Sequence, residues 1–354
     1  MKKPASLLVA AAWAALSACG GGGGPTDPNP QPSGAAELLS TTGLYTDIAR
    51  KQVDPRNLPW QPQYPLWTDG GAKERWIRLP QGTRIDTSNM DRWVFPVGTK
   101  FYKEFSFNGR RVETRIMEKV AAGAALESWT FKAFQWRADE SDATLVSTNG
   151  VPNAAPTGLG TMHDIPSQSQ CRSCHSRGGD AVNGFDALQL SSDRDPLAVE
   201  AARLQPGDVT MDELERQGLV THASGDDVRV ASSSDSGRWV MGFLHGNCSN
   251  CHNPQGPAAV SGLDFRHAAD SRREADEPAF RTTVNQLTTV YNMPNTQVGV
   301  NSFRILGGAP EQSAVFFRMN SRGSIHQMPP FGTKAVDAEA LGLVGDWIRR
   351  LPRP

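Results

Sequence analysis

Two short segments of this chain combine a pair of cysteines with an adjacent histidine, in the same order and spacing. The first is Cys171-Arg-Ser-Cys174-His175 and the second is Cys248-Ser-Asn-Cys251-His252. Two thiols separated by two residues can form thioether bonds with the two vinyl groups of one porphyrin, and the histidine that follows can ligate its iron. Each segment therefore predicts one covalently attached c-type haem, with His175 and His252 as proximal iron ligands.

Two other uses of paired cysteines are weaker interpretations. Zinc ribbons usually separate their cysteine pairs by roughly 15–20 residues, whereas Cys174 and Cys248 are much farther apart. A four-thiolate zinc site also has no need of a histidine after each pair. A redox-active dithiol needs only one pair, on a βαβ scaffold that the sequence does not indicate. Four of the five cysteines belong to the two motifs and the fifth is Cys19, so none remains for a structural disulfide.

A haem that transfers electrons usually has a second axial ligand, and a methionine thioether gives it a higher potential than a second histidine does. For the second haem we predict Met328, which lies between the motif and the end of the chain in Gln327-Met328-Pro329-Pro330. Two prolines stiffen this segment, which resembles the Met-Pro loop of class I cytochromes c. His326 is the alternative ligand, and Met319 is expected to pack in the interior.

The first motif has no such loop after it. We predict His163 as the distal ligand, because Pro166 could turn the chain so that His163 returns to the haem. The other candidates are Met162, Met211, His222 and Met241. The first haem could also be five-coordinate, and an open iron can bind small ligands or react with peroxide.

The N-terminus has the features of a bacterial lipoprotein signal. Residues 1–18 begin with Lys2 and Lys3 and continue with an apolar run that is too short to span a bilayer. Leu16-Ser17-Ala18-Cys19 resembles a lipobox, so we expect cleavage before Cys19 and acylation of its thiol; an ordinary signal cut near Ala18 is the alternative. Residues 19–36 are rich in Gly and Pro and predict a flexible tether. The expected location is the periplasmic side of a membrane, or the outer membrane, with a lipid anchor.

The rest of the chain divides into three parts. Residues 37–160 contain runs of alternating polar and apolar residues, with Asn108-Gly109 as a hairpin turn, and predict a β domain. Residues 161–235 surround the first motif and contain one capped helix after Thr210. Residues 236–354 predict a helix running into Cys248 and a terminal helix over 337–351. The expected fold is multidomain: an all-β, sandwich-like domain followed by two mainly α cytochrome c-type segments, the second similar to class I cytochromes c.

Beyond the haem motifs, several strings resemble a family of bacterial dihaem c-type cytochromes, often lipoproteins, with a Trp-rich N-terminal β region. The resemblance runs from about residue 40 to the end of the chain. The strings that carry it are Tyr64-Pro65-Leu66-Trp67-Thr68-Asp69-Gly70, Arg75-Trp76-Ile77-Arg78-Leu79-Pro80, residues 93–100, 163–168 and 246–253, and Gln327-Met328-Pro329-Pro330. The resemblance implies haem attachment and redox function and, as a partner, a secreted parallel β-helix repeat protein.

These features favour a dihaem c-type cytochrome that transfers single electrons between periplasmic or membrane redox proteins. The alternative is a dihaem peroxidase, or another redox enzyme, with one open haem. A third hypothesis is that the β domain binds a polysaccharide. The formal net charge of −1 and the lack of a basic stripe argue against nucleic acid as a partner.

Overall fold

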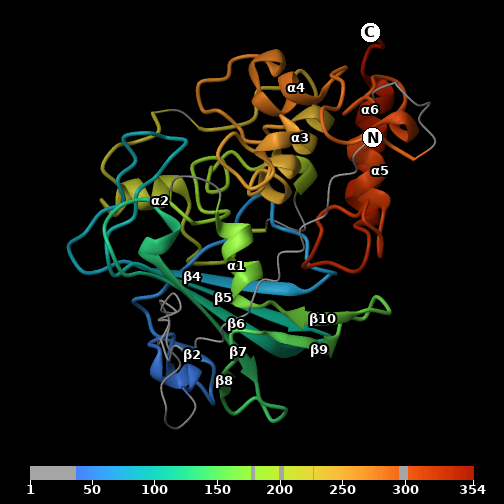
Figure 1. Ribbon diagram of the computed structural model, residues 1–354. Coiled ribbons are helices and arrows are strands. Elements are labelled where there is room, and N and C mark those ends of the chain that lie inside the picture. Colours follow the sequence, from blue (N-terminus) through green and yellow to red (C-terminus); the bar gives the residue numbers. More distant parts are fainter. Residues whose placement is uncertain (1–36, 177–179, 199–202, 226, 295–301) are drawn as a thin grey trace, which may run out of the picture. The chain divides into compact units, whose positions relative to one another are not determined.

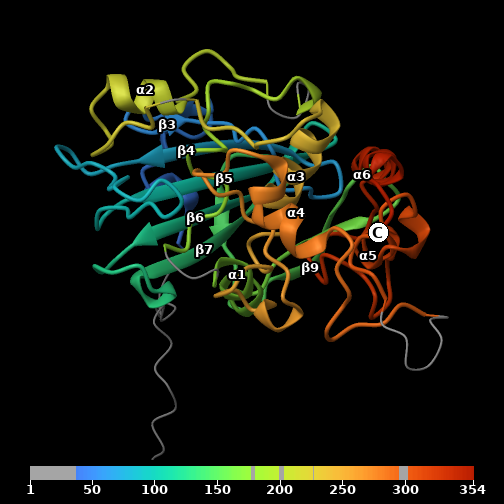
Figure 2. The ribbon, with the colours of Figure 1, turned by 90° about the horizontal axis from the view of Figure 1, so that it is seen from above.

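The alternating runs form one six-stranded antiparallel sheet in the order β3–β4–β5–β6–β7–β8 (Figure 1). The computed structural model describes residues 37–176, 180–198, 203–225, 227–294 and 302–354. Figure 2 shows β3 to β7 side by side in this order. The strands are β3 (Leu58–Pro59), β4 (Ala72–Arg78), β5 (Lys100–Phe107), β6 (Arg110–Lys119), β7 (Trp129–Trp136) and β8 (Ala143–Leu145).

Asn108 and Gly109 join β5 to β6, as the sequence predicts. Their φ angles are 52° and 75°, and two residues with positive φ make the hairpin turn whose twist matches that of the flanking strands. Asparagine and glycine are the residues that adopt this backbone conformation most readily.

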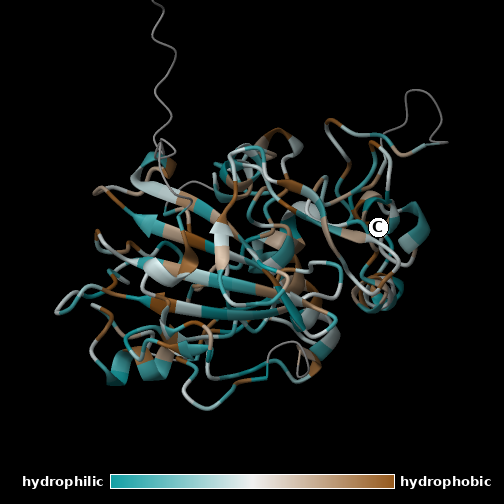
Figure 3. Cartoon of the chain, turned by 90° about the horizontal axis from the view of Figure 1, so that it is seen from below, coloured by the Kyte–Doolittle hydropathy of each residue, from teal (hydrophilic) through white to brown (hydrophobic). Residues whose placement is uncertain are grey.

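The sheet has two buried faces, because successive side chains of a strand point to opposite sides. Figure 3 shows this alternation of hydrophilic and hydrophobic residues along the strands. The outer face carries Trp76, Tyr102 and Phe134, which pack against the short helix η1 (Leu39–Thr41) and against β1 (Tyr45–Asp47), the partner of β2 (Gln52–Val53). The inner face carries Ile77, Phe101, Trp129 and Phe131, which pack against residues of the 181–220 segment.

A second two-stranded sheet, β9 (Val151–Pro156) and β10 (Met162–Ile165), lies before the first motif. Its Ala154 and Ala155 pack against Phe105 and Phe107 of β5. The small sheet thereby places His163 of β10 against the inner face of the six-stranded sheet.

The described residues contain six α-helices, which are α1 (Gln168–His175), α2 (Met211–Arg216), α3 (Asp235–Asn247), α4 (Pro278–Thr283), α5 (Ala314–Asn320) and α6 (Ala338–Arg350). Short 3-10 helices are η2 (Leu126–Ser128), η3 (Pro196–Ala198), η4 (Ala259–Ser261), η5 (Glu274–Asp276) and η6 (Pro310–Gln312). The helix running into Cys248 and the terminal helix match the predictions. Val240 and Leu244 of α3 and Val344 and Ile348 of α6 share one core.

The predicted fold class is wrong. An all-β sandwich followed by two mainly α segments is not what forms, because loops make up most of both motif-bearing parts and the first part also contains strand β10. In residues 161–235 the α-helices have only 8 and 6 residues, and β10 belongs to the same part. The physical reason is that the large sheet supplies the apolar surface that covers this segment, so the segment can fold as loops without a helical layer of its own.

The predicted signal peptide, Cys19 and the tether lie outside the described residues. Among the residues that the structure does describe, no helix is both long enough and apolar enough to cross a bilayer.

Candidate functional site

Helix α3 delivers the second motif and docks closely on the β region. Ser234 caps its N-terminus by accepting a hydrogen bond from the backbone N–H of Gly237. A Cβ at Gly242 would lie 2.1 Å from the Tyr64 ring, and one at Gly246 would lie 2.1 Å from the Tyr64 carbonyl oxygen. Glycine is therefore required at both positions, and Tyr64 determines where α3, and hence Cys248, is placed.

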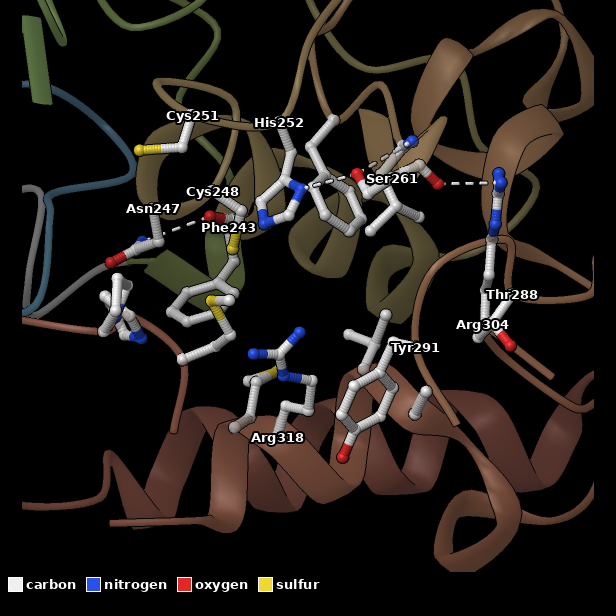
Figure 4. Close-up of a pocket in the computed structure, with 18 of the residues that line it drawn as sticks. Phe243, Asn247, Cys248, Cys251, His252, Ser261, Thr288, Tyr291, Arg304 and Arg318 are labelled. Carbon is white, nitrogen blue, oxygen red and sulfur yellow. Dashed lines mark hydrogen bonds between the residues drawn. The ribbon is translucent and has the colours of Figure 1, made fainter. Parts of the chain in front are cut away.

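Cys248, Cys251 and His252 line one mainly apolar cavity (Figure 4). Met328 lines the same cavity. The cavity encloses about 1130 Å³ of empty space, part of which is open to solvent. Its apolar walls include Phe243, Leu263, Phe265, Val290, Ala314, Val315, Met319 and Pro330. The structure thus brings together the four residues that the sequence predicts for the second haem, although Met328 is far from the motif in the chain.

The hydrogen bonds of His252 define which ring nitrogen carries the proton. The Ser261 hydroxyl donates to the carbonyl oxygen of Ala258 at 2.7 Å, so it must accept from His252 Nδ1 at 3.1 Å. Nδ1 therefore holds the hydrogen and Nε2 carries the lone pair. Burial, together with the Arg318 guanidinium, lowers the pKa of His252 to about 4, so the imidazole is neutral at pH 7. A neutral imidazole with Nδ1–H bonded to protein is the form that ligates metals.

The cysteine thiols of the second motif are uncharged at neutral pH. Burial and the neighbouring Cys251 raise the pKa of Cys248 to about 12, and burial also raises that of Cys251. In the described part of the chain, no group of three or more His, Cys, Asp or Glu side chains could hold a metal ion. A porphyrin supplies four equatorial nitrogens itself, so it requires only axial ligands from the protein.

The first motif lies on helix α1, which packs on strand β7. Ser167 and Gln170 form a capping box at the helix N-terminus. The side-chain amide of Gln168 donates to the carbonyl oxygen of Phe131 at 2.5 Å, and the His175 ring lies 5.1 Å from the Phe131 ring. Cys171 packs against the core of the inner face. The large sheet therefore positions the first motif.

His175 resembles His252 in its hydrogen bonding. His175 Nδ1 lies 2.6 Å from the carbonyl oxygen of Ala181. A carbonyl oxygen only accepts, so Nδ1 carries a hydrogen and donates it. Both motif histidines thus donate from Nδ1 to the protein, as metal-ligating histidines do. The sequence contains no signal for Ala181 or Ser261, because one acts through its backbone and the other is a common residue type.

His163, the predicted distal ligand of the first haem, is buried on the inner face of the sheet. Its Nε2 lies 2.9 Å from Glu113 Oε2, and Phe105 and Phe107 lie 5.9 and 4.7 Å from its ring. Iron ligation through Nε2 would require His163 to leave Glu113. Ligation of the first haem by His163 therefore stays a prediction.

The remaining ligand candidates have other surroundings. Met211 is buried in the core against the sheet and Met241 in the core of α3 and α6. His222 is exposed and lies 3.0 Å from the Thr221 hydroxyl. His326, the alternative to Met328, contacts the Tyr291 hydroxyl at 3.1 Å.

The cysteine thiols of the first motif are also uncharged at neutral pH. Burial raises the pKa of Cys174 to about 12 and raises that of Cys171 as well.

Sequence reasoning missed a loop of the β region that completes the second site. The Trp67 backbone N–H donates to Asn247 Oδ1 at 2.7 Å, and its indole N–H donates to the carbonyl oxygen of Ala335 at 3.3 Å. The Asp69 carboxylate accepts from the backbone N–H groups of Lys334 and Ala335. Trp67 also lines the cavity. The string at residues 64–70 was a signal for this loop, but its contact with the 328–335 segment is not visible in sequence.

The donor set at each motif fits a covalently held haem: two protonated thiols and an imidazole that donates from Nδ1 to the protein. At the second motif the imidazole is neutral and a methionine lines the same apolar cavity. Comparison with family models, curated proteins and solved structures finds no match to this chain.

Proposed function

We propose that this protein is a dihaem c-type cytochrome that transfers single electrons. The observation that carries the proposal is the convergence of Cys248, Cys251, His252 and Met328 on one mainly apolar cavity. The hydrogen bonds that His175 and His252 both donate from Nδ1 support it. The family resemblance of the β-region strings is consistent with it and remains a prediction.

The residues of the chain have distinct tasks in this proposal. When bound, each haem supplies an iron that changes oxidation state by one electron. The thiols of each motif hold the cofactor covalently, which prevents its loss outside the cytoplasm. His175 and His252 ligate through Nε2, while Ala181 and Ser261 hold their rings in orientation. Met328 ligates the second iron, and the apolar walls exclude water, both of which raise the potential.

The cellular setting is part of the proposal. We infer export as a lipoprotein acylated at Cys19, on the periplasmic side of a membrane, with redox proteins as partners and a β-helix repeat protein as one candidate among them.

Haem stoichiometry tests the proposal directly. The purified mature protein should carry two haems, measured by its pyridine haemochrome spectrum and by intact mass after denaturation. Cys171→Ala with Cys174→Ala should leave one haem, and so should Cys248→Ala with Cys251→Ala. The two double variants control for each other, because each leaves the other motif intact. A denatured wild-type chain without bound chromophore would overturn the proposal.

A redox enzyme with an open first haem is the second candidate, and one observation favours it. His163 Nε2 is engaged by Glu113, so the first iron would lack this ligand if that contact persists. An enzyme of this kind shows a high-spin haem at rest and turns over peroxide with a reduced donor. A fully low-spin protein without peroxide turnover would exclude it.

A further inference from the structure

Three cations lie directly opposite one another across three strands of the sheet. Arg75 of β4 pairs with Lys103 of β5, and Lys103 pairs with Arg115 of β6. Lys73 lies two residues before Arg75 and so shares its face of β4. Like charges directly opposite each other destabilise a sheet. We call Lys73, Arg75, Lys103 and Arg115 the cation row.

The protein neutralises this row only in part. Arg115 donates to both carboxylate oxygens of Glu113, at 2.6 and 2.9 Å. Arg75 donates to the amide oxygen of Gln61 and Lys73 to the carbonyl oxygen of Gly71, and both of these acceptors are neutral. Within the described residues, the Lys103 amine has no hydrogen bond or ion pair and lies 5.0 Å from the centre of the Phe105 ring.

Other carboxylates near the row have tasks elsewhere. Asp69 and Asp337 interact with the charge of Lys73, and Asp208 interacts with that of Arg75. Asp69 accepts from backbone N–H groups of the 334–335 segment, Asp337 caps α6 and Asp208 accepts from the backbone N–H of Gln205. Desolvation and the neighbouring cations lower the pKa of Lys103 well below its usual range. The row therefore lacks the negative charge that would keep Lys103 protonated, and a bound anion would supply it.

The cation row faces the first motif. It is on the inner face of the sheet, the face on which α1 packs through Phe131. Arg115 pairs with Ala133 of β7, which lies two residues from Phe131 and on the same face of that strand. Cys171 packs against the core to which Phe131 belongs. The sheet register therefore places the cation row beside the strand that carries the first motif.

A c-type haem carries two propionate carboxylates, which must be paired with cations or hydrated when the ring is buried. We propose that the cation row binds the propionate carboxylates of the haem attached to Cys171 and Cys174. The inference rests on the proposed function, since it requires that haem to be present. Arginine pairs with carboxylates in a two-pronged geometry, and the anion would relieve the repulsion across the three strands.

The alternative ligand of the same chemistry is a soluble anion, such as a carboxylate or phosphate from solution. Lys103→Met and Lys100→Met distinguish the two sources in the full-length holoprotein. Lys100 is on the same strand and is the matched control, because its side chain points to the outer face and pairs with Glu118 at 3.5 Å. Lys103→Arg keeps the charge. Haem content is measured first for every variant, and a wild-type protein without two haems would refute the proposed function rather than this inference.

Redox titration followed by visible spectroscopy is the readout. A nearby cation favours the reduced state, so Lys103→Met should lower the reduction potential of one haem. We expect the equilibrium constant for reduction to fall about tenfold, which corresponds to about 59 mV for a one-electron couple. The affected haem should be the one without a sulfur-to-iron charge-transfer band. Lys100→Met and Lys103→Arg should leave both potentials near those of the wild type.

Three outcomes would overturn the inference. The first is an unchanged potential in Lys103→Met, and the second is an equal shift in Lys100→Met. The third is a shift of wild-type potentials when phosphate replaces chloride at constant ionic strength, because a row filled by propionates has no room for a soluble anion.

Discussion

Lys119 and Asp180 form a buried ion pair that links strand β6 to the segment after the first motif. Lys119 Nζ lies 2.6 and 2.7 Å from the two carboxylate oxygens of Asp180, and the side chains are 1% and 2% exposed. Asp180 also accepts hydrogen bonds from the Trp129 indole and from the backbone N–H of Phe95. Three donors therefore hold the Asp180 carboxylate: the Lys119 amine, the Trp129 indole N–H and the Phe95 backbone N–H.

The position of Asp180 matters for the haem because Ala181, the next residue, accepts the hydrogen bond of His175. Asp180→Asn should destabilise the protein by about 3–5 kcal/mol, since it leaves the Lys119 charge buried without its partner. Urea unfolding measures the change. Glu118→Gln removes the part-exposed pair with Lys100 on the same sheet and should cost less than about 1 kcal/mol. Equal costs for the two variants would contradict this assessment.

Met328→His should abolish the sulfur-to-iron charge-transfer band and lower the potential of the second haem, because a thioether favours the reduced iron more than imidazole does. The absorption spectrum and a redox titration measure these effects. Met319→Leu is the matched control, since Met319 lines the same cavity and its loss should leave the band intact. An unchanged band in Met328→His would exclude Met328 as the ligand.

Ser261→Ala should raise the potential of the second haem. Its hydroxyl oxygen accepts from His252 Nδ1–H, and such a bond makes the imidazole a stronger donor that favours ferric iron. We expect a change of about three- to tenfold in the equilibrium constant, or ~30–60 mV for one electron. Thr289→Val, at another position in the cavity wall, should have little effect. A lower potential in Ser261→Ala would reverse the assigned direction of the hydrogen bond.

His163→Gln tests the predicted ligand of the first haem. Glutamine can still donate to Glu113, so the buried Arg115–Glu113 pair keeps a partner. If His163 is the distal ligand, electron paramagnetic resonance should show conversion of one haem from low to high spin. His222→Ala replaces an exposed histidine and should leave the spin state unchanged. No change of spin state in His163→Gln would assign His163 to a structural role.

Glu104 should give the protein a characteristic pH dependence. Burial raises the pKa of this carboxyl, which also accepts from the Tyr45 hydroxyl at 2.5 Å. The folded state therefore holds the proton to higher pH than the unfolded state does, and the contribution of Glu104 to stability falls as pH rises from its ordinary pKa through the raised one.

Comparison of wild type with Glu104→Gln by urea unfolding between pH 4 and 7 measures this effect. The stability of the wild type relative to Glu104→Gln should decrease with rising pH. Glu311→Gln is the control, because Glu311 is exposed and is not among the groups that interact with Glu104, so it should not change the pH profile. A relative stability that increases with pH would show that the folded pKa is depressed.

Local patterns determined several elements of this protein from the sequence alone. The spacing within Cys171–His175 and Cys248–His252 predicts haem attachment because both thiols and the imidazole lie within five consecutive residues. Asn108-Gly109 predicts its hairpin, and the apolar stripe over 337–351 predicts α6, because these signals depend on residues that are close in the chain.

Only the tertiary structure decided which distant residues meet at each motif. Three arrangements depend on contacts between remote parts of the chain: Met328 in the cavity of the second motif, the Trp67 loop beside Ala335, and the first motif on strand β7 of the large sheet. The sequence pattern also predicts too much helix around the first motif. It cannot tell whether the apolar residues of that segment are buried by helices of the same segment or by the six-stranded sheet, whose strands come earlier in the sequence. Burial is a property of the whole fold, whereas propensity and periodicity are properties of neighbouring residues.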